Sequence, residues 1–291
     1  MPLRVATWNV NSIRARIELA ARFIEGYQPD VLCLQETKVS DLLFPRAEFE
    51  HWGYSHIALS GAVGAPGVAI LSRRPFAATS VREWCRRKDH RYLEARLDNG
   101  LELHNYYVPA GGDIPDPERN PKFAHKLQFL AEVAAWYRDR PGRDQPALLV
   151  GDLNVAPYQT DVWSHARLRN VITHTEVEIA ALNAVREAFD WVDVMRRFVP
   201  EDQTLFTWWS YRGTTDWQAA TPTDAPAGAP ASAQRGKQGE RGEQRGGRRL
   251  DHVWATPAAS ALCTAMEVVT EARGWPRPSD HVPVIVDLDL D

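Results

Sequence analysis

Short apolar runs rich in β-branched residues recur along the chain, and each ends in polar residues, glycine or proline. Runs of this length and composition are typical of strands buried in a layered sheet. Because they extend from the first residues to the last, we expect sheet structure throughout the chain. The clearest runs are Leu3–Thr7, Val31–Leu34, Val68–Leu71, Ala147–Val150, Leu250–Ala255 and Val282–Leu288.

Helical periodicity and turn residues occur between these runs. Apolar residues share one face of segments 13–27 and 122–138, which predicts a helix in each. Asn99-Gly100 favours a tight hairpin turn, since this pair tolerates positive φ angles. Strand, helix, strand and hairpins follow one another roughly twice, once in each half of the chain, which predicts a mixed α/β sandwich. No glycine-rich phosphate-binding motif follows the first strand, so a dinucleotide or P-loop site is not expected.

The composition is that of a globular enzyme. Of 291 residues, 44% are hydrophobic and 25% charged, and we expect a single domain over residues 1–291. The net charge of −4 excludes a generally basic nucleic-acid binder but allows a local basic groove. Three isolated cysteines, together with the lack of a leader and of a membrane-length apolar run, predict a cytoplasmic protein that does not use a membrane.

Residues 218–247 depart from this composition. They consist largely of alanine, proline, glycine, glutamine and arginine, with few large apolar side chains to offset the entropy lost on ordering. We therefore expect a flexible insertion within the domain. Residues 218–249 hold six cationic and three acidic side chains, which leaves two interpretations: a solvated linker, or a mobile basic arm that contacts a polyanion.

Carboxylates and carboxamides follow three of the predicted strands. Glu36 comes after the second run, Asp152 and Asn154 after the fourth, and Asn9 and Asn11 after the first. Alternate spacing points the side chains of Asp152 and Asn154 to one side if the backbone is extended. A hard cation needs oxygen ligands, and an acid beside a carboxamide can hold and orient a water.

One histidine, His281, precedes the last apolar run and follows Asp280. A lone histidine is more often structural than catalytic, but an aspartate that fixes its tautomer and stabilises its cation is a recurrent catalytic arrangement. Asp251, beside another strand-like run, is a second candidate partner, and spacing does not decide between the two aspartates. Together these segments predict hydrolysis of a phosphate ester with a divalent metal.

Seven motifs resemble those of the exonuclease III family, which are Mg²⁺-dependent DNA-repair nucleases of the endonuclease/exonuclease/phosphatase superfamily. They span nearly the whole chain in order, and only residues 218–247 are foreign to the family. The Asn-Val-Ala-Pro and Trp-Ser-Tyr-Arg runs are more specific to the DNA-repair branch than the Asp-His pair. The motifs are Thr7–Arg14, Leu34–Lys38, Asn105–Pro109, Gly151–Pro157, Trp208–Arg212, Arg249–His252 and Ser279–Pro283.

The resemblance implies a fold, a reaction and a cofactor. The fold would be a four-layer α/β sandwich of two packed mixed β-sheets flanked by helices. The reaction would be in-line hydrolysis of DNA phosphodiesters, as an AP endonuclease, 3′–5′ exonuclease or 3′-phosphatase, leaving a 3′-hydroxyl. The cofactor would be Mg²⁺, for which Mn²⁺ can substitute. The substrate would be double-stranded DNA with abasic sites or damaged 3′ ends, cleaved by a monomer.

The resemblance also implies a role for each residue of the site. Glu36 would be the principal metal ligand, with Asn9 and Asp280 near the metal. Asp152 would align or deprotonate the attacking water, and Asn154 would hold that water and a phosphate oxygen.

Further roles concern the phosphate and the rest of the DNA. Tyr107 would contact the phosphate as its charge develops, and His281, paired with Asp251, would donate to a non-bridging oxygen. Trp208 would line the pocket for an abasic deoxyribose or terminal nucleotide, with Leu250 close by, although a core aromatic is the competing interpretation. The other expected DNA contacts are Arg249, Arg14, Lys38, Lys126 and Arg212.

Two positions depart from the family pattern. Arg248 stands where relatives usually carry an apolar residue that helps to close the abasic pocket, and Ala110 stands where they often carry an amide that contacts phosphate. Both leave open the balance between abasic-site incision, exonuclease and 3′-end cleaning. The alternatives are a phosphoesterase of the same fold acting on lipid or inositol phosphates, and a catalytically inactive DNA-binding relative.

Overall fold

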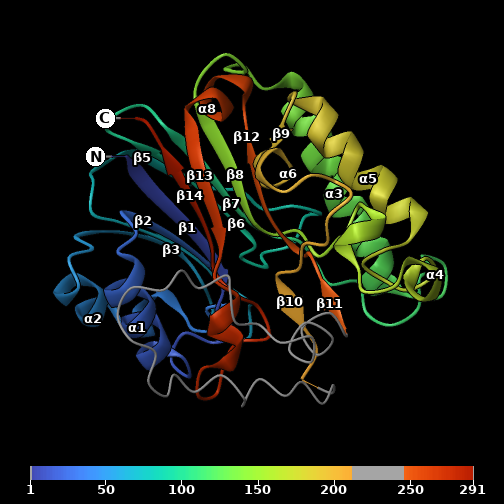
Figure 1. The fold of residues 1–291 in the computed structure, drawn as a ribbon, viewed down its shortest axis with the longest axis horizontal. Helices are drawn as coiled ribbons and strands as arrows, with labels where there is room; N and C mark the ends of the chain where they lie inside the picture. Colours follow the sequence, from blue (N-terminus) through green and yellow to red (C-terminus); the bar gives the residue numbers. More distant parts are fainter. Residues whose placement is uncertain (1, 212–245, 291) are drawn as a thin grey trace, which may run out of the picture.

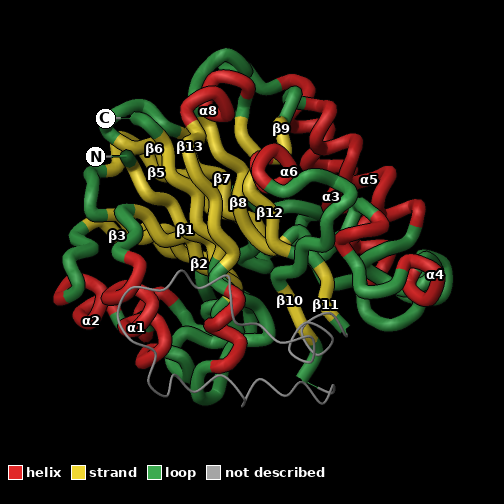
Figure 2. Tube along the Cα trace, viewed as in Figure 1, coloured by secondary structure: helices red, strands yellow, loops and turns green. Residues whose placement is uncertain are grey.

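The structure is a computed structural model that describes residues 2–211 and 246–290. Within them, two six-stranded β-sheets pack face to face with helices on both outer sides (Figures 1 and 2). Sheet A has the order β13 (Cys263–Val268), β14 (Val284–Leu288), β1 (Leu3–Asn9), β2 (Val31–Gln35), β4 (Val68–Ser72) and β3 (His56–Ser60). Sheet B has the order β5 (Phe76–Val81), β6 (Tyr92–Leu97), β7 (Glu102–Tyr107), β8 (Ala147–Asp152), β12 (Asp251–Ala255) and β9 (Val192–Asp193). The predicted sandwich of two mixed sheets is confirmed.

Each sheet contains one parallel pair of strands joined by a crossover helix. β1 and β2 are connected through α1 (Ile17–Tyr27), and β7 and β8 through α3 (Pro121–Asp139). The other neighbours within the two sheets are antiparallel. Gly100, with a φ of +89°, turns the chain between β6 and β7, as the Asn-Gly pair predicts.

The two sheets do not correspond to the two halves of the sequence. β13 and β14, from the end of the chain, belong to sheet A, where β14 pairs with β1. The recurring order of elements therefore does not divide the chain into one sheet per half. The late strands cover an edge of β1 that would otherwise expose unpaired backbone groups.

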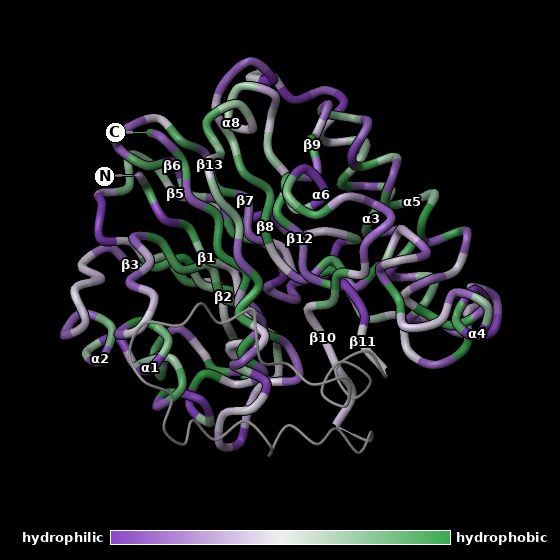
Figure 3. The backbone as a smooth tube through the Cα atoms, viewed as in Figure 1, coloured by the Kyte–Doolittle hydropathy of each residue, from purple (hydrophilic) through white to green (hydrophobic). Residues whose placement is uncertain are grey.

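Apolar clusters hold the layers together. The cluster between the sheets joins Val5 and Ile70 of sheet A with Leu103 and Val150 of sheet B. A second cluster packs α1 on the outer face of sheet A, and a third packs α3 and α5 (Glu176–Ala188) on the outer face of sheet B. Figure 3 shows hydrophobic residues along the strands between these helical layers.

Shorter elements complete the described chain. They are α2 (Arg46–His51), α4 (His165–Leu168), α6 (Val194–Phe198), α8 (Pro257–Leu262), the 3₁₀ turns η1 (Asp41–Leu43), η2 (Gln159–Asp161) and η4 (Thr270–Gly274), and a two-stranded ladder of β10 (Trp208–Trp209) and β11 (Gly247–Arg248). Of the predicted 218–247 insertion, only Gly246 and Gly247 are described, and Gly247 is a strand residue rather than linker. In the described ranges, no helix is long and apolar enough to cross a membrane.

Two buried amide side chains connect the sheets. Gln35 at the end of β2 donates to Oδ1 of Asn105 in β7 at 2.7 Å. The amide nitrogen of Asn105 donates to the backbone oxygens of Leu34 at 3.0 Å and Ala69 at 2.9 Å. Both amides are fully buried. Because a buried polar group that loses its partner costs about 1–3 kcal/mol, these bonds oppose sliding of one sheet over the other.

Gly151 allows β8 to approach β7 more closely than any other residue would. Its φ is +130°, and a Cβ there would lie 2.0 Å from the backbone oxygen of Tyr106. Gly151→Ala should lower the free energy of unfolding by about 2–4 kcal/mol, because the clash and the left-handed strain add. Gly26→Ala in α1, where nothing lies within 4 Å, is the control and should stabilise by up to about 1 kcal/mol. Urea unfolding measures both, and an equally stable Gly151→Ala protein would contradict the expectation.

Candidate functional site

Polar side chains from both sheets meet at one end of the sandwich. β1, β2, β7 and β8 run toward this end, and β12 and β14 run away from it. Residues at the ends of β1, β2, β7 and β8 therefore come close to residues at or just before the starts of β12 and β14. The side chains gathered there are Asn9, Glu36, Tyr107, Asp152, Asp251 and His281.

Asn9 links the carboxylates of the two sheets. Its side-chain nitrogen donates to Glu36 Oε1 at 3.0 Å and to Asp152 Oδ2 at 2.9 Å. The same nitrogen lies 3.4 Å from His281 Nε2. Asn9 is fully buried and Asp152 is 1% exposed. The two carboxylates are therefore held together by one protein donor instead of by water.

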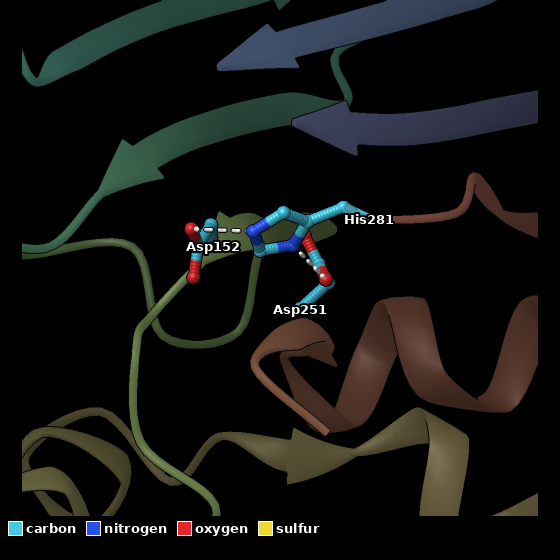
Figure 4. Close-up of side chains that lie close together, drawn as sticks. All are labelled: Asp152, Asp251 and His281. Atoms are coloured by element: carbon cyan, nitrogen blue, oxygen red, sulfur yellow. Dashed lines mark hydrogen bonds and ion pairs between the residues drawn. The ribbon is translucent and has the colours of Figure 1, made fainter. Parts of the chain in front are cut away.

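His281 lies between two aspartates (Figure 4). Its Nδ1 is 2.8 Å from Asp251 Oδ2, and its Nε2 is 3.5 Å from Asp152 Oδ2. The partner that the spacing left open is thus Asp251. Asp280 accepts instead from the indole nitrogen of Trp208 at 3.0 Å.

Burial and neighbouring charge shift two pKa values at this centre. Burial raises the pKa of Asp152 to about 7; the charge of His281 opposes this, and the charges of Asp251 and Glu36 add to it. Burial would lower the pKa of His281, but Asp251 and Asp152 outweigh it and raise the pKa to about 10. The imidazole is therefore a cation that donates from Nδ1 to Asp251 and carries a second N–H at Nε2, and Asp152 accepts a proton near neutral pH.

Tyr107 presents a neutral hydroxyl to the same carboxylates. It is paired in register with Asp152, and its hydroxyl bonds to Glu36. Burial, with the charges of Glu36 and Asp152, holds the pKa of Tyr107 well above its ordinary value. Arg91 packs over the Tyr107 ring, 4.9 Å from guanidinium carbon to ring centre. Sequence reasoning missed Arg91, because only the pairing of β6 with β7 brings it there.

Two candidates for holding a metal ion lie at this end of the sandwich: a cluster of three side chains, and the single carboxylate of Glu36. Donor atoms of Asp152, Asp251 and His281 all lie within 4.8 Å of one another. Both ring nitrogens already face carboxylates, however, and a protonated imidazole has no lone pair for a metal. Glu36 fits a hard cation better, because its side chain is 17% exposed and the ammonium of Lys38 already lies 2.6 Å from its Oε2.

Strained backbone gathers around these residues. Asn11, Glu36 and Asn154 have φ angles of +45°, +50° and +53°, in the left-handed region. The backbone is not extended at Asn154, so the condition under which Asp152 and Asn154 would point to one side is not met. Instead, the Asn154 backbone N–H donates to Asp152 Oδ1 at 2.9 Å, and its side chain donates to the Val108 carbonyl at 2.9 Å.

Sequence similarity to known proteins extends over nearly the whole chain. A profile described as the Endonuclease/Exonuclease/phosphatase family matches residues 6–281. The chain belongs to this family. Exodeoxyribonuclease III of Haemophilus influenzae is 26% identical over 301 residues, which cover 97% of this chain and 98% of that protein.

Solved structures of family proteins share the fold. An AP endonuclease from Archaeoglobus fulgidus has a TM-score of 0.83 at 31% identity, covering 99% of this chain and 100% of the other. A 3′ phosphatase from Neisseria, bound to a product DNA hairpin, has a TM-score of 0.81 at 27% identity and covers 99% of each chain.

Two DNA contacts expected from the family resemblance are wrong for this chain. Lys126 and Arg249 are both fully buried, so neither reaches a DNA backbone. The ammonium of Lys126 donates to the backbone oxygen of Asn154 at 2.7 Å. Both cations hold the chain that follows β8 in place. Their acidic partners are Glu178 for Lys126, and Asp161 and Asp193 for Arg249.

The other expected contacts differ in their surroundings. Arg14, Lys38 and Ala110 are exposed, and Arg212 lies outside the described residues. Leu250 is buried in a small apolar cluster against which Trp208 packs. The closeness of Leu250 and Trp208 fits a shared pocket wall, and their roles in binding DNA stay predictions.

Asp251→Asn should shift the pH dependence of kcat/KM toward lower pH. In the wild type, we expect activity to rise as Asp152 ionises through about pH 7 and to fall as His281 loses its proton near pH 10. The charge of Asp251 raises both pKa values, so its removal lowers both limbs of the profile. The rate should also fall by about 10²–10⁴-fold. Initial rates across the pH range measure this, and an unmoved alkaline limb would argue against the pairing of Asp251 with His281.

Proposed function

We propose that this chain is a metal-dependent DNA-repair nuclease that hydrolyses phosphate esters at abasic sites or 3′ ends of DNA and leaves a 3′-hydroxyl. The observation that carries the proposal is a buried His281 between Asp251 and Asp152, joined through Asn9 to Glu36. The names of the relatives, exodeoxyribonuclease III, AP endonuclease and 3′ phosphatase, support DNA as the substrate. A single chain supplies every group, so we expect a monomer to act.

In the proposed reaction, Asp152 orients the attacking water and takes its proton. Its two oxygens are fixed by the backbone N–H of Asn154 and the side chain of Asn9, so the carboxylate cannot rotate freely. Burial raises its pKa to about 7, which makes it a stronger base than an ordinary aspartate. Asn154 would help to hold the water and a phosphate oxygen.

His281 and Tyr107 would donate to the phosphate. The 3.5 Å separation of His281 Nε2 from Asp152 is longer than a strong hydrogen bond, so Nε2 is available to a non-bridging oxygen. Asp251 balances the imidazolium from the other side. Donors fixed at such positions before reaction typically contribute about 10²–10³-fold each in rate.

The metal would be bound by Glu36, with Asn9 and Asp280 as further proposed members of the site. Mg²⁺, or Mn²⁺ in its place, would supply positive charge that neutralises the phosphate and stabilises the negative charge of the transition state. In this structure the side-chain nitrogen of Asn9 faces Glu36, and its oxygen accepts from the backbone of Asn11 at 3.0 Å. Asn9 therefore orders Glu36 directly.

Incubation with DNA tests the proposal. With Mg²⁺, the protein should cleave duplex oligonucleotides carrying an abasic site or a 3′-phosphate, and should leave phospholipids and inositol phosphates intact. Asp152→Asn should lower kcat by about 10²-fold or more, because the water loses its base. Asp144→Asn, an exposed carboxylate, is the control and should be fully active. Gel analysis of the products measures the cleavage. Binding of DNA by the wild type without metal-dependent cleavage, or full activity of Asp152→Asn, would overturn the proposal.

Glu36→Gln should lower the apparent affinity of the protein for Mg²⁺. The neutral amide loses most of its attraction for a divalent cation, so half-maximal activity should need about tenfold more Mg²⁺ or higher. Titration of EDTA-treated protein with Mg²⁺ and with Mn²⁺ measures the change, with exposed Glu25→Gln in α1 as the control. An unchanged metal dependence with a lower kcat would remove Glu36 as the principal ligand.

A further inference from the structure

His281 and three residues from other segments, Trp208, Arg248 and Val162, form a row of paired residues. Trp208 of β10 pairs with Arg248 of β11 on one side and with His281 on the other, and Arg248 pairs in turn with Val162. Residues directly opposite one another in a ladder direct their side chains to the same face. The indole of Trp208 and the guanidinium of Arg248 therefore extend from the face that carries the imidazole of His281.

The side-chain contacts of Arg248 agree with this placement. Its guanidinium carbon lies 5.3 Å from the centre of the Trp208 ring, and Trp208 is itself fixed by its bond to Asp280. Nη1 of Arg248 donates to the carbonyl of Ile172 at 3.0 Å and to Thr173 Oγ1 at 2.6 Å. The guanidinium is thus held by the hydrogen bonds of Nη1 and by its packing against the Trp208 ring, and Trp208 pairs with His281.

This cation has no carboxylate partner among the described residues. Its Nε is buried there without a hydrogen-bond partner. Glu178, whose charge raises the pKa of Arg248, is already paired with Lys126. Burial lowers the pKa of Arg248, yet a guanidinium remains charged at any working pH. The next residue, Arg249, pairs with two aspartates. A partly buried cation that has Nη2 unused and no carboxylate partner among the described residues favours binding of an anion.

We infer that Arg248 makes the site favour terminal 3′-phosphate monoesters over abasic-site diesters. The inference rests on the proposed nuclease function and specifies its substrate. A monoester carries an additional negative oxygen where a diester carries the next sugar. Nη2 of Arg248, which has no hydrogen bond within the described residues, can donate a charge-assisted hydrogen bond to a phosphate oxygen, whereas a base-free sugar is neutral. Arg248 lies over Trp208, the expected wall of the abasic pocket, and would compete with such a sugar for that ring.

The reaction balances without a further reagent. The oxygen of water bonds to phosphorus, the bond from phosphorus to the 3′ oxygen breaks, and the 3′ oxygen takes up one proton. The products are a DNA 3′-hydroxyl and inorganic phosphate. Arg248 would contact an oxygen that remains on phosphorus, so we expect it to act on the choice of substrate and not on the attacking water.

Arg248→Leu tests the inference, because it removes the charge and keeps apolar contact with Trp208. On one duplex sequence carrying either a 3′-phosphate or an internal abasic site, kcat/KM for the 3′-phosphate should fall by about 10²-fold, as expected for loss of a charge-assisted pair. Abasic incision should be unchanged or faster. Arg248→Lys should recover part of the phosphatase activity. Arg167→Leu is the matched control. The guanidinium carbon of Arg167 also lies over a tryptophan, 5.4 Å from the centre of the Trp163 ring, but Arg167 is not among the residues paired with Trp208 and His281.

Product inhibition provides a second measurement. Inorganic phosphate should inhibit the wild type and Arg167→Leu equally, and Arg248→Leu at least about tenfold more weakly. If the ratio of 3′-phosphatase to abasic-site activity and the inhibition by phosphate were both unchanged in the two Arg248 variants, the inference would be overturned. The proposed nuclease function would be unaffected. A wild type with neither activity would instead overturn the proposed function.

Discussion

The site depends on the alignment of two sheets, neither of which holds a complete set of groups. Sheet A contributes Asn9 and leads directly into Glu36, whereas sheet B contributes Asp152 and Asp251. Apolar packing between the sheets is strong but non-directional, so by itself it does not set their register. The buried bonds of Asn105 to Gln35 and to two backbone oxygens are directional. Directional bonds between buried groups favour one arrangement of a core.

The charges at the centre are useful because they are buried together. Asp251 and Asp152 on either side of His281 make the imidazolium stable, and that cation in turn limits the rise of the Asp152 pKa. The ammonium of Lys38 stabilises the charge of the more exposed Glu36 and lowers its pKa. Asp152 and His281 therefore depend on each other for their protonation states, and single substitutions should alter more than one step of the reaction.

The strands β1, β2, β4, β8, β12 and β14, the α1 and α3 helices and the hairpin at Gly100 were predictable from the sequence, because apolar periodicity and turn chemistry are local properties. The burial of Lys126 and Arg249 was not. It depends on ion-pair partners 52 and 88 positions away, which no local pattern reveals. The choice of Asp251 over Asp280 likewise needed the fold, since Asp280 adjoins His281 in sequence but turns its side chain to Trp208.

The position of β14 has a consequence for synthesis of the protein. β1 leaves the ribosome before Val284–Leu288, one of its two neighbours in sheet A, because most strands of both sheets lie between the two in the sequence. Until β14 is made, β1 keeps an open edge, which is prone to pair with other chains. His281 lies three positions before β14 and is made with it. Closure of the sheet and assembly of the catalytic centre therefore coincide, and a ribosome-bound chain that lacks these residues has neither a finished sheet nor the means to cut DNA.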